Sequence, residues 1–173
     1  ASNPSAGKYS WQFDGSNDSL SLGAPLFQMS DDHAVIAGCS PAVSSLSAGV
    51  VSQTGTNAYV PNLGFLSGSP YAYWRDDALT VENLGGTSVS VGSAVVLTAV
   101  KISNAKRLRQ NGVQKASGSI VMGTSTITSQ GIGQGGSFWN GSIYPIIAIK
   151  GTVSDAELMV LEKYVGMCCG VSI

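Results

Sequence analysis

Apolar and polar residues alternate in short segments along most of this chain, which is the pattern of half-buried β-strands. In the segment 9–13 this alternation places Tyr9, Trp11 and Phe13 on one face of a strand. By the same pattern and by the turn residues between segments, further strands are predicted at 20–22, 33–39, 50–53, 57–60, 64–67, 71–75, 79–83, 87–91, 94–102, 124–128 and 143–150. Many short strands separated by turns predict a sandwich or a barrel.

The segment 94–118 is the most informative part of the sequence. It contains a long apolar strand, a tight turn, a shorter strand, a second turn at Asn111-Gly112 and a third strand. Asn-Gly is a strong hairpin signal because both residues tolerate positive φ. The glycine-rich segment 131–136 matches no phosphate-binding spacing and precedes no helix, so we expect a flexible loop there.

One helix is expected near the C-terminus. Ser154 and Glu157 have the spacing of a capping box, in which each side chain satisfies the other residue's backbone. The apolar residues that follow lie on one helical face: Leu158, Leu161 and Val165. Gly166 is expected to end the helix. This helix of about three turns should cover one end or edge of the sandwich.

Together these elements predict an all-β sandwich or barrel with one short C-terminal helix. The length of 173 residues fits a single domain, 1–173. Only 11% of the residues are charged and the net charge is −1, which argues against binding to nucleic acid. Because the sequence has no run of 18 apolar residues, we expect no membrane insertion.

Neither a cofactor nor a metal is expected. The three cysteines, Cys39, Cys168 and Cys169, form a poor disulfide framework, and one histidine leaves too few ligands for zinc. We expect reduced thiols, with Cys39 packed as a small apolar residue; a bridge from Cys39 to Cys168 or Cys169 is the alternative. Two acidic pairs, at 31–32 and 76–77, could supply calcium ligands, but solvated turn residues are the favoured interpretation.

Four segments in order carry a family resemblance: 13–18, 96–113, 138–143 and 153–158. They resemble the concanavalin A-like lectin/glucanase sandwiches, and specifically the laminin-G-like jelly rolls. This resemblance implies an all-β fold: a two-sheet antiparallel jelly-roll sandwich with one short C-terminal helix. Two departures stand out. The chain has Tyr144-Pro145 where the family usually has acidic residues, and Val95-Val96 where it often has Trp-His. Since proline cannot donate to a ladder, we expect its strand to be bulged or at an edge.

The C-terminal segment 161–173 resembles the endings of such domains in bacteriophage virion proteins. This resemblance implies a non-enzymatic binding module of a tail fibre, spike or capsid decoration. Its expected partners are a cell-surface carbohydrate or receptor and other virion proteins, with a homo-oligomer left open, and its expected location is the virion surface or the extracellular space. Two alternatives remain: a purely structural virion module, and a polysaccharide-active enzyme.

Catalytic residues are not expected. Glycosidases of this fold resemble one another in a Glu-x-Asp-x-x-Glu strand, whereas this chain has only Glu82, Glu157 and Glu162. The last two are expected to be a cap and part of a solvated helix face. Related lyases use a tyrosine and a histidine, and His33 is expected at the surface or at a strand end. No strand presents the paired carboxyl groups, about 5–10 Å apart, that glycoside hydrolysis needs.

The segment 71–77 is the best candidate for a glycan-binding site. Sugars stack on exposed aromatic rings, and polar side chains bind their hydroxyls. Period two places Tyr71, Tyr73 and Arg75 on one strand face and Trp74 on the other. The complete candidate site comprises Tyr71, Tyr73, Trp74, Arg75, Asp76, Asp77, Trp139 and Asn140. The alternative is that these aromatic rings fill the core.

A basic cluster could contact anionic glycans. Its members lie along the central hairpins: Lys101, Lys106, Arg107, Arg109 and Lys115. The favoured interpretation is an ordinary exposed hairpin face.

Overall fold

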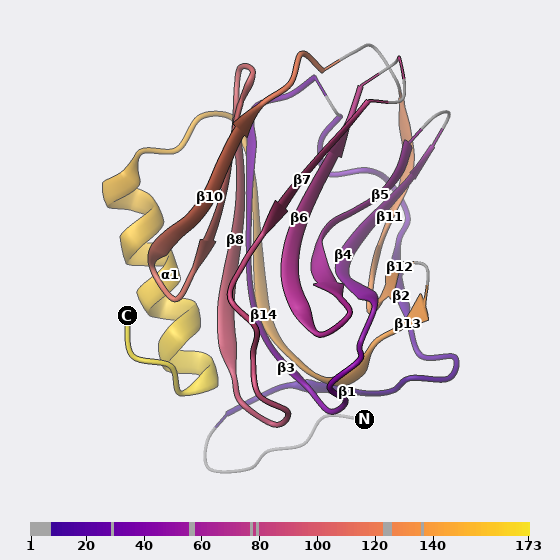
Figure 1. Cartoon of the computed structure of the whole chain (residues 1–173), viewed down its shortest axis with the longest axis vertical. Coiled ribbons are helices and arrows are strands. Elements are labelled where there is room, and N and C mark those ends of the chain that lie inside the picture. The colour runs from indigo at the N-terminus through magenta and orange to yellow at the C-terminus, as the bar shows by residue number, and fades with distance from the viewer. Residues whose placement is uncertain are drawn as a thin grey trace.

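The computed structural model describes residues 8–28, 30–55, 58–76, 78, 80–122, 126–135 and 137–173, with the backbone alone for 54–55 and 58–62. Within these residues the chain forms two antiparallel six-stranded sheets and one helix. The helix, the first sheet and the second sheet follow one another from left to right in Figure 1. This arrangement confirms the predicted jelly-roll sandwich.

The first sheet has the order β1 (Trp11–Asp14), β14 (Asn140–Lys150), β3 (His33–Pro41), β8 (Val95–Ile102), β9 (Ala105–Gln110) and β10 (Val113–Ser119). The second has the order β2 (Leu20–Leu22), β11 (Ile127–Ile132), β4 (Ala48–Gly55), β5 (Ala58–Leu66), β6 (Ser69–Arg75) and β7 (Val81–Gly85). A small hairpin joins β12 (Gln134–Gly135) to β13 (Ser137–Phe138).

The main core lies between the two sheets. Val35 and Leu97 from the first sheet belong to the same buried cluster as Leu63 and Phe65 from the second. Trp139 also belongs to this cluster and contacts Phe65 edge to face, with 5.5 Å between ring centroids. The alternation seen in the sequence therefore reflects one buried and one outer face on most strands.

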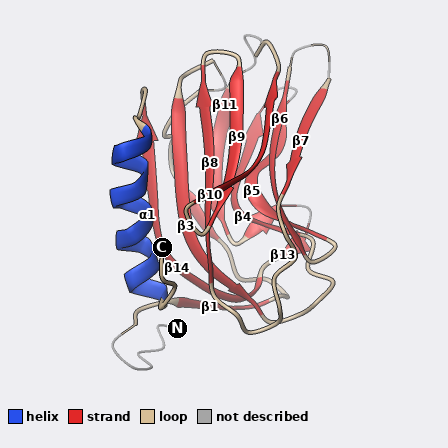
Figure 2. Ribbon diagram, turned by 60° about the vertical axis from the view of Figure 1, so that its left-hand side comes forward, coloured by secondary structure: helices blue, strands red, loops and turns tan. Residues whose placement is uncertain are grey.

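Helix α1 (Asp155–Cys169) packs against the outside of β3, β8 and β14, as Figure 2 shows. The capping box is confirmed: Glu157 N donates to Ser154 Oγ, and Ser154 N donates to Glu157 Oε2. The helix covers a face of the first sheet, so the prediction of an end or edge is wrong. The helix face contributes Leu158 and Val165 to a second buried cluster.

The prediction that Gly166 ends the helix is wrong. The helix continues to Cys169, and Gly170 caps it in the left-handed conformation with φ of 80°. At Gly166 the C-terminal tail returns to the helix, so that an added Cβ would lie 2.6 Å from the carbonyl oxygen of Val171. This glycine therefore permits a close packing contact inside the helix.

The local signals in the strands had mixed outcomes. The Asn111-Gly112 turn is confirmed, with φ of 51° and 77°. The strand predicted at 87–91 is absent. The backbone N–H and C=O of Thr87 form hydrogen bonds with the side-chain amide of Gln110, so they are not available to a neighbouring strand. The expected loop at 131–136 is wrong for residues 131–132, which extend β11, and for 134–135, which form β12; Gly136 lies outside the described residues.

The predictions for Cys39 and Pro145 are confirmed. All three cysteines are free thiols, and Cys39 is fully buried in the main core. The ladder between β14 and β3 shifts register between Ile143 and Ile146, at the position of Pro145. Because proline has no N–H to contribute, the strand is bulged there.

Candidate functional site

Strand β6 divides the predicted binding residues between its two faces. Ala72 and Trp74 point into the main core, and Trp74 is only 2% exposed. The alternate residues Tyr71, Tyr73 and Arg75 therefore lie on the outer face of the second sheet. The two faces predicted for this strand from its period are thus present in the structure.

The outer face of β6 carries a partly exposed aromatic and basic pair. Tyr73 and Arg75 are partly exposed, whereas Tyr71 is 8% exposed, and its burial raises the pKa of its hydroxyl. Arg75 Nε is buried, and no described residue accepts a hydrogen bond from it. A buried N–H without a partner is unfavourable. Because the side chain as a whole is partly exposed, its guanidinium can also donate to an acceptor oxygen of a ligand at the surface.

Asp76 follows β6 and organises the next turn. Its Oδ1 accepts from Thr80 N at 2.7 Å, and its own N–H donates to Thr80 O at 3.0 Å. One carboxylate oxygen is thus committed to the backbone, while the side chain as a whole is partly exposed beside Arg75. Asp77, the last residue of the predicted segment, lies outside the described residues.

Two tryptophans of the predicted site belong to the core. Trp74 and Trp139 are 2% and 0% exposed, so neither presents a ring face to a sugar. For these two the alternative interpretation, aromatic rings filling the core, describes the structure, and they are removed from the candidate site. Asn140 is partly exposed at the start of β14, and its carbonyl accepts from Ala42 N at 2.9 Å.

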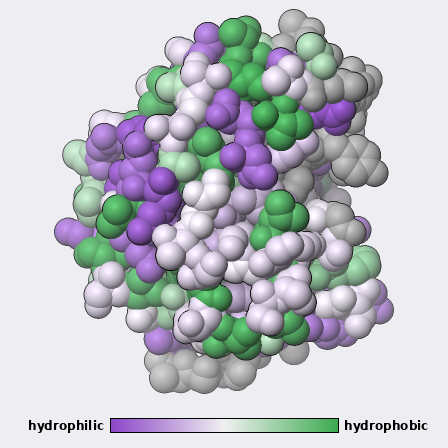
Figure 3. Space-filling view, in the orientation of Figure 1, coloured by the Kyte–Doolittle hydropathy of each residue, from purple (hydrophilic) through white to green (hydrophobic). Residues whose placement is uncertain are grey.

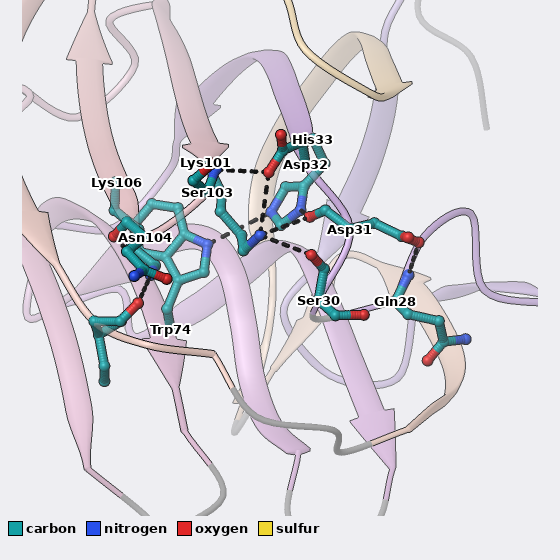
Figure 4. Close-up of polar contacts among 11 residues, drawn as sticks. Gln28, Ser30, Asp31, Asp32, His33, Trp74, Lys101, Ser103, Asn104 and Lys106 are labelled. Carbon is teal, nitrogen blue, oxygen red and sulfur yellow. Dashed lines mark hydrogen bonds and ion pairs between the residues drawn. The ribbon is translucent and has the colours of Figure 1, made fainter.

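Beneath β6, Trp74 takes part in a buried polar cluster (Figure 4). Its indole Nε1 donates to His33 Nε2 at 3.5 Å, and His33 Nδ1 donates to the carbonyl oxygen of Asp31 at 2.9 Å. Since a carbonyl only accepts, the proton of the neutral imidazole is on Nδ1. Phe27 stacks on the imidazole with 4.2 Å between centroids. These contacts explain why Trp74 is held in the core.

His33 is the first residue of β3, so the expected position at a strand end is confirmed, whereas the alternative position at the surface is wrong because the side chain is buried. Desolvation is the main cause that lowers its pKa to about 4, outweighing the hydrogen bond to Asp31. The nearby Lys101 ammonium lowers the pKa further. The imidazole is therefore neutral at physiological pH, and its two nitrogens are occupied by protein groups.

The acidic pair at 31–32 holds cations of the protein itself. Asp31 Oδ2 accepts from Gln28 N and pairs with Lys150 Nζ at 2.8 Å. Asp32 Oδ1 accepts from Ser103 N at 2.7 Å and lies 3.4 Å from Lys101 Nζ. Figure 4 shows the Lys101 ammonium beside Asp32 Oδ1 and the backbone carbonyl oxygens of Ser30 and Asp31. Within the described residues, no cluster of three or more His, Cys, Asp or Glu could hold a metal ion.

The predicted basic cluster is not one exposed face. Lys101, Lys106 and Arg109 are buried, which contradicts that expectation. Lys106 Nζ donates to the carbonyls of Asn104 and Ile120, and desolvation lowers its pKa to about 8. Lys101 Nζ likewise donates to backbone carbonyls, those of Ser30 and Asp31.

Glu162 is also buried, so its expected place on a solvated helix face is wrong. Its carboxylate receives Arg109 Nε at 2.8 Å and Nη2 at 2.9 Å. Glu157 is occupied by the capping box, and Glu82 lies across the sandwich edge from Gly118 of β10. The three glutamates of the chain thus lie in separate structural contacts.

A cleft that the sequence did not point to lies where β1 meets β14. It has a volume of about 330 Å³ and is lined by Tyr9, Ser10, Trp11, Tyr144, Pro145 and Ile146. The alternation at 9–13 placed Trp11 on the same strand face as Phe13, but in edge strand β1 Phe13 is buried while Trp11 is exposed. The signal available in the sequence was the dipeptide Tyr144-Pro145, in which an aromatic residue precedes a proline that interrupts the ladder.

The face shown in Figure 3 is mostly pale at its centre, with hydrophobic residues in separate patches. In the residues that the structure describes, no helix has the length and apolar character needed to cross a membrane.

Comparisons with known proteins match the fold and not the sequence. No family model and no curated protein sequence matches the chain. Domain 4 of AbnA, a GH43 extracellular arabinanase from Geobacillus stearothermophilus solved with arabinotriose, is 15% identical with a TM-score of 0.65; the alignment covers 94% of this chain and 80% of that one.

Two further solved structures are larger than this chain. Mouse laminin α1 domains LG4-5 are 11% identical with a TM-score of 0.66, over 80% of this chain and 40% of that one. The binding domain of botulinum neurotoxin DC in complex with SialylT is 11% identical with a TM-score of 0.60, over 79% of this chain and 36% of that one. The chain thus spans less than half of these two proteins.

These likenesses establish the fold. It is a two-sheet jelly roll that the chain shares with these solved domains. One of them belongs to an arabinanase and another is the binding domain of a toxin, so the fold by itself does not fix the function.

Proposed function

We propose that this chain is a non-enzymatic binding module that recognises a cell-surface glycan or receptor, and that the outer face of β6 is its binding surface. The observation that carries the proposal is that Tyr73 and Arg75 lie, both partly exposed, on the same outer face of β6. Arg75 Nε has no hydrogen-bond partner among the described residues. An aromatic ring supplies a stacking surface for a sugar, and a guanidinium donates to its hydroxyl or carboxylate oxygens.

Two of the neighbouring folds support a carbohydrate as the ligand class. The arabinanase domain was solved with arabinotriose, and the neurotoxin binding domain with SialylT. We further propose, from the resemblance of the segment 161–173 to phage virion domains, that the module belongs to a tail fibre, spike or capsid decoration. Host-surface recognition is the role that suits a sugar-binding module in such a place.

A glycan array probed with the purified chain tests this proposal. We expect binding to a restricted set of glycans, with acidic sugars among them if Arg75 pairs with a carboxylate. The matched control is Arg75→Gln, which keeps hydrogen-bonding capacity but removes the charge; acidic glycans should lose more signal than neutral ones. The array should be probed at protein concentrations up to about 100 µM, since a Kd of that size corresponds to a binding free energy of only about −5.5 kcal/mol. If no glycan binds at these concentrations, carbohydrate recognition is contradicted.

A second candidate function is a structural module that contacts another virion subunit. Val160, Tyr164 and Met167 recur at helical spacing on the outward side of α1 and are all exposed. An exposed apolar stripe of this kind marks a protein contact surface. Analytical ultracentrifugation of the chain and of Val160→Lys/Met167→Lys tests this function. Self-association that the double variant abolishes would support it, and a monomer at all concentrations would leave the glycan-binding proposal favoured.

A further inference from the structure

The cleft between β1 and β14 is separate from the candidate surface on β6. It belongs to the edge of the first sheet, whereas β6 lies in the second sheet. Its lining comes from two chain segments: Tyr9, Ser10 and Trp11 at and just before the start of β1, and Tyr144, Pro145 and Ile146 in β14. Strands β1 and β14 are neighbours in one sheet. Paired strands leave no room for a cleft between them, so their pairing must be interrupted where the cleft lies.

Pro145 provides that interruption. Strand β1 pairs with β14 in a regular antiparallel register from Asp14↔Asn140 to Trp11↔Ile143. Continuing this register would place Tyr9 opposite Pro145, which has no N–H for the ladder. The bulge in β14 begins at the same place, between Ile143 and Ile146. The ladder therefore stops, and the two sides diverge to leave a cleft of about 330 Å³.

Two aromatic residues of this cleft are exposed, in contrast to the two tryptophans of the predicted site. Tyr9 is 74% exposed and Trp11 is 44% exposed, while Trp74 and Trp139 are buried. Exposing such large rings to water is unfavourable, and covering them with a ligand recovers the hydrophobic free energy. Trp11 is thus the tryptophan of this chain that a ligand can reach without unfolding.

The polar groups in the cleft carry no charge. The lining residues carry hydroxyls on Tyr9, Tyr144 and Ser10 and an indole N–H on Trp11; within the described part of the chain, they include no ionisable acid or base other than the two phenols. Ser10 Oγ is oriented by Gln12 Nε2, which donates to it at 3.0 Å. Apolar ring faces bordered by neutral hydroxyls complement a neutral ligand with C–H faces and hydroxyl edges, which is the chemistry of a hexopyranose.

We propose that the cleft of Tyr9, Trp11 and Tyr144 is a second carbohydrate site, which binds a neutral hexopyranose unit by stacking it on Trp11. This site differs in chemistry from the β6 surface, where Arg75 favours acidic or hydroxyl-rich sugars. If one polysaccharide molecule spans both sites, the module binds it more strongly than either site would alone.

Intrinsic fluorescence and amide NMR with cellotriose, maltotriose and mannotriose test this site. We expect at least one of these sugars to shift the tryptophan emission in a saturable way and to perturb amides near Tyr9, Trp11 and Tyr144. Trp11→Ala should lower the affinity at least tenfold, and Trp11→Phe, which keeps a stacking ring, should lose less. Tyr9→Ala gives a second test, because its exposed ring contributes little to the fold.

Tyr73→Ala separates this site from the proposed function on β6. It should leave the affinity of the cleft for the neutral sugar unchanged. Three sugars without effect, or a Trp11→Ala variant that binds as tightly as the unmodified protein, would overturn the cleft proposal. If array binding persists in Trp11→Ala and disappears in Tyr73→Ala, the β6 proposal stands and the cleft proposal falls. The converse result would place glycan binding in the cleft alone.

Discussion

Arg109 on β9 and Glu162 on α1 form a buried, two-point ion pair that fastens the helix to the first sheet. The Nε–Oε1 distance is 2.8 Å and the Nη2–Oε2 distance is 2.9 Å, and Nη2 also donates to Gly112 O. The pairing raises the pKa of Arg109, mainly through its hydrogen bond to Glu162. The C-terminal segment therefore has a specific polar contact in addition to its apolar packing.

Replacing Arg109 by Met should lower the free energy of unfolding by about 3–5 kcal/mol, because it leaves the buried Glu162 carboxylate without a partner. Denaturant midpoints measure the loss. Arg107→Met is the matched control: its partner Asp155 is exposed, so breaking this 2.7 Å pair should cost at most about 1 kcal/mol. Equal, small losses in the two variants would contradict a structural role for the buried pair.

His33 should titrate with a pKa of about 4 instead of 6.5. A depressed pKa means that the unfolded chain binds the proton more tightly, so the stabilising contribution is complete above pH 6.5 and is lost as the pH falls towards 4. The loss should reach about 3 kcal/mol. Because the chain has a single histidine, proton NMR follows it directly. A pKa near 6.5 in the folded protein would show that the ring is solvated.

Ser154→Ala should lower the free energy of unfolding by about 1 kcal/mol, because it removes the acceptor for Glu157 N at the start of α1. Ser154→Asp should recover most of this loss, since aspartate is a good N-cap and favours the helix N-terminus electrostatically. Thermal or denaturant unfolding of the two variants gives the comparison. An unchanged unfolding midpoint for the alanine variant would show that the Ser154 cap does not stabilise the fold.

Local signals predicted a large part of the fold. The turn at Asn111-Gly112 and the capping box at Ser154 depend on neighbouring residues alone, and both are present. The helix was expected to end at Gly166 because a glycine there is a typical stop signal, but that residue instead accommodates the returning C-terminal tail. Such a contact depends on residues that come together only in three dimensions.

The binding residues were harder to predict, for a related reason. Period two correctly separated Tyr73 from Trp74, but it cannot say which face of a strand meets the other sheet. Burial of His33 and Glu162 depends on partners from other elements, namely Trp74 and Arg109. The exposure of Trp11 follows from its place in an edge strand, which the local sequence does not reveal.

The affinity of Tyr73→Ala for the strongest glycan found on the array tests the central proposal most directly. We expect at least a tenfold loss of affinity with an unchanged unfolding midpoint, because Tyr73 lies on the partly exposed outer face of β6. Trp74→Ala is the counterpart: it removes a core ring and should cost about 3–5 kcal/mol of stability. Tyr164→Ala, on the exposed side of α1, controls for loss of a surface tyrosine. A Tyr73→Ala variant that folds normally and binds as tightly as the unmodified chain would contradict the assignment of the binding surface to β6.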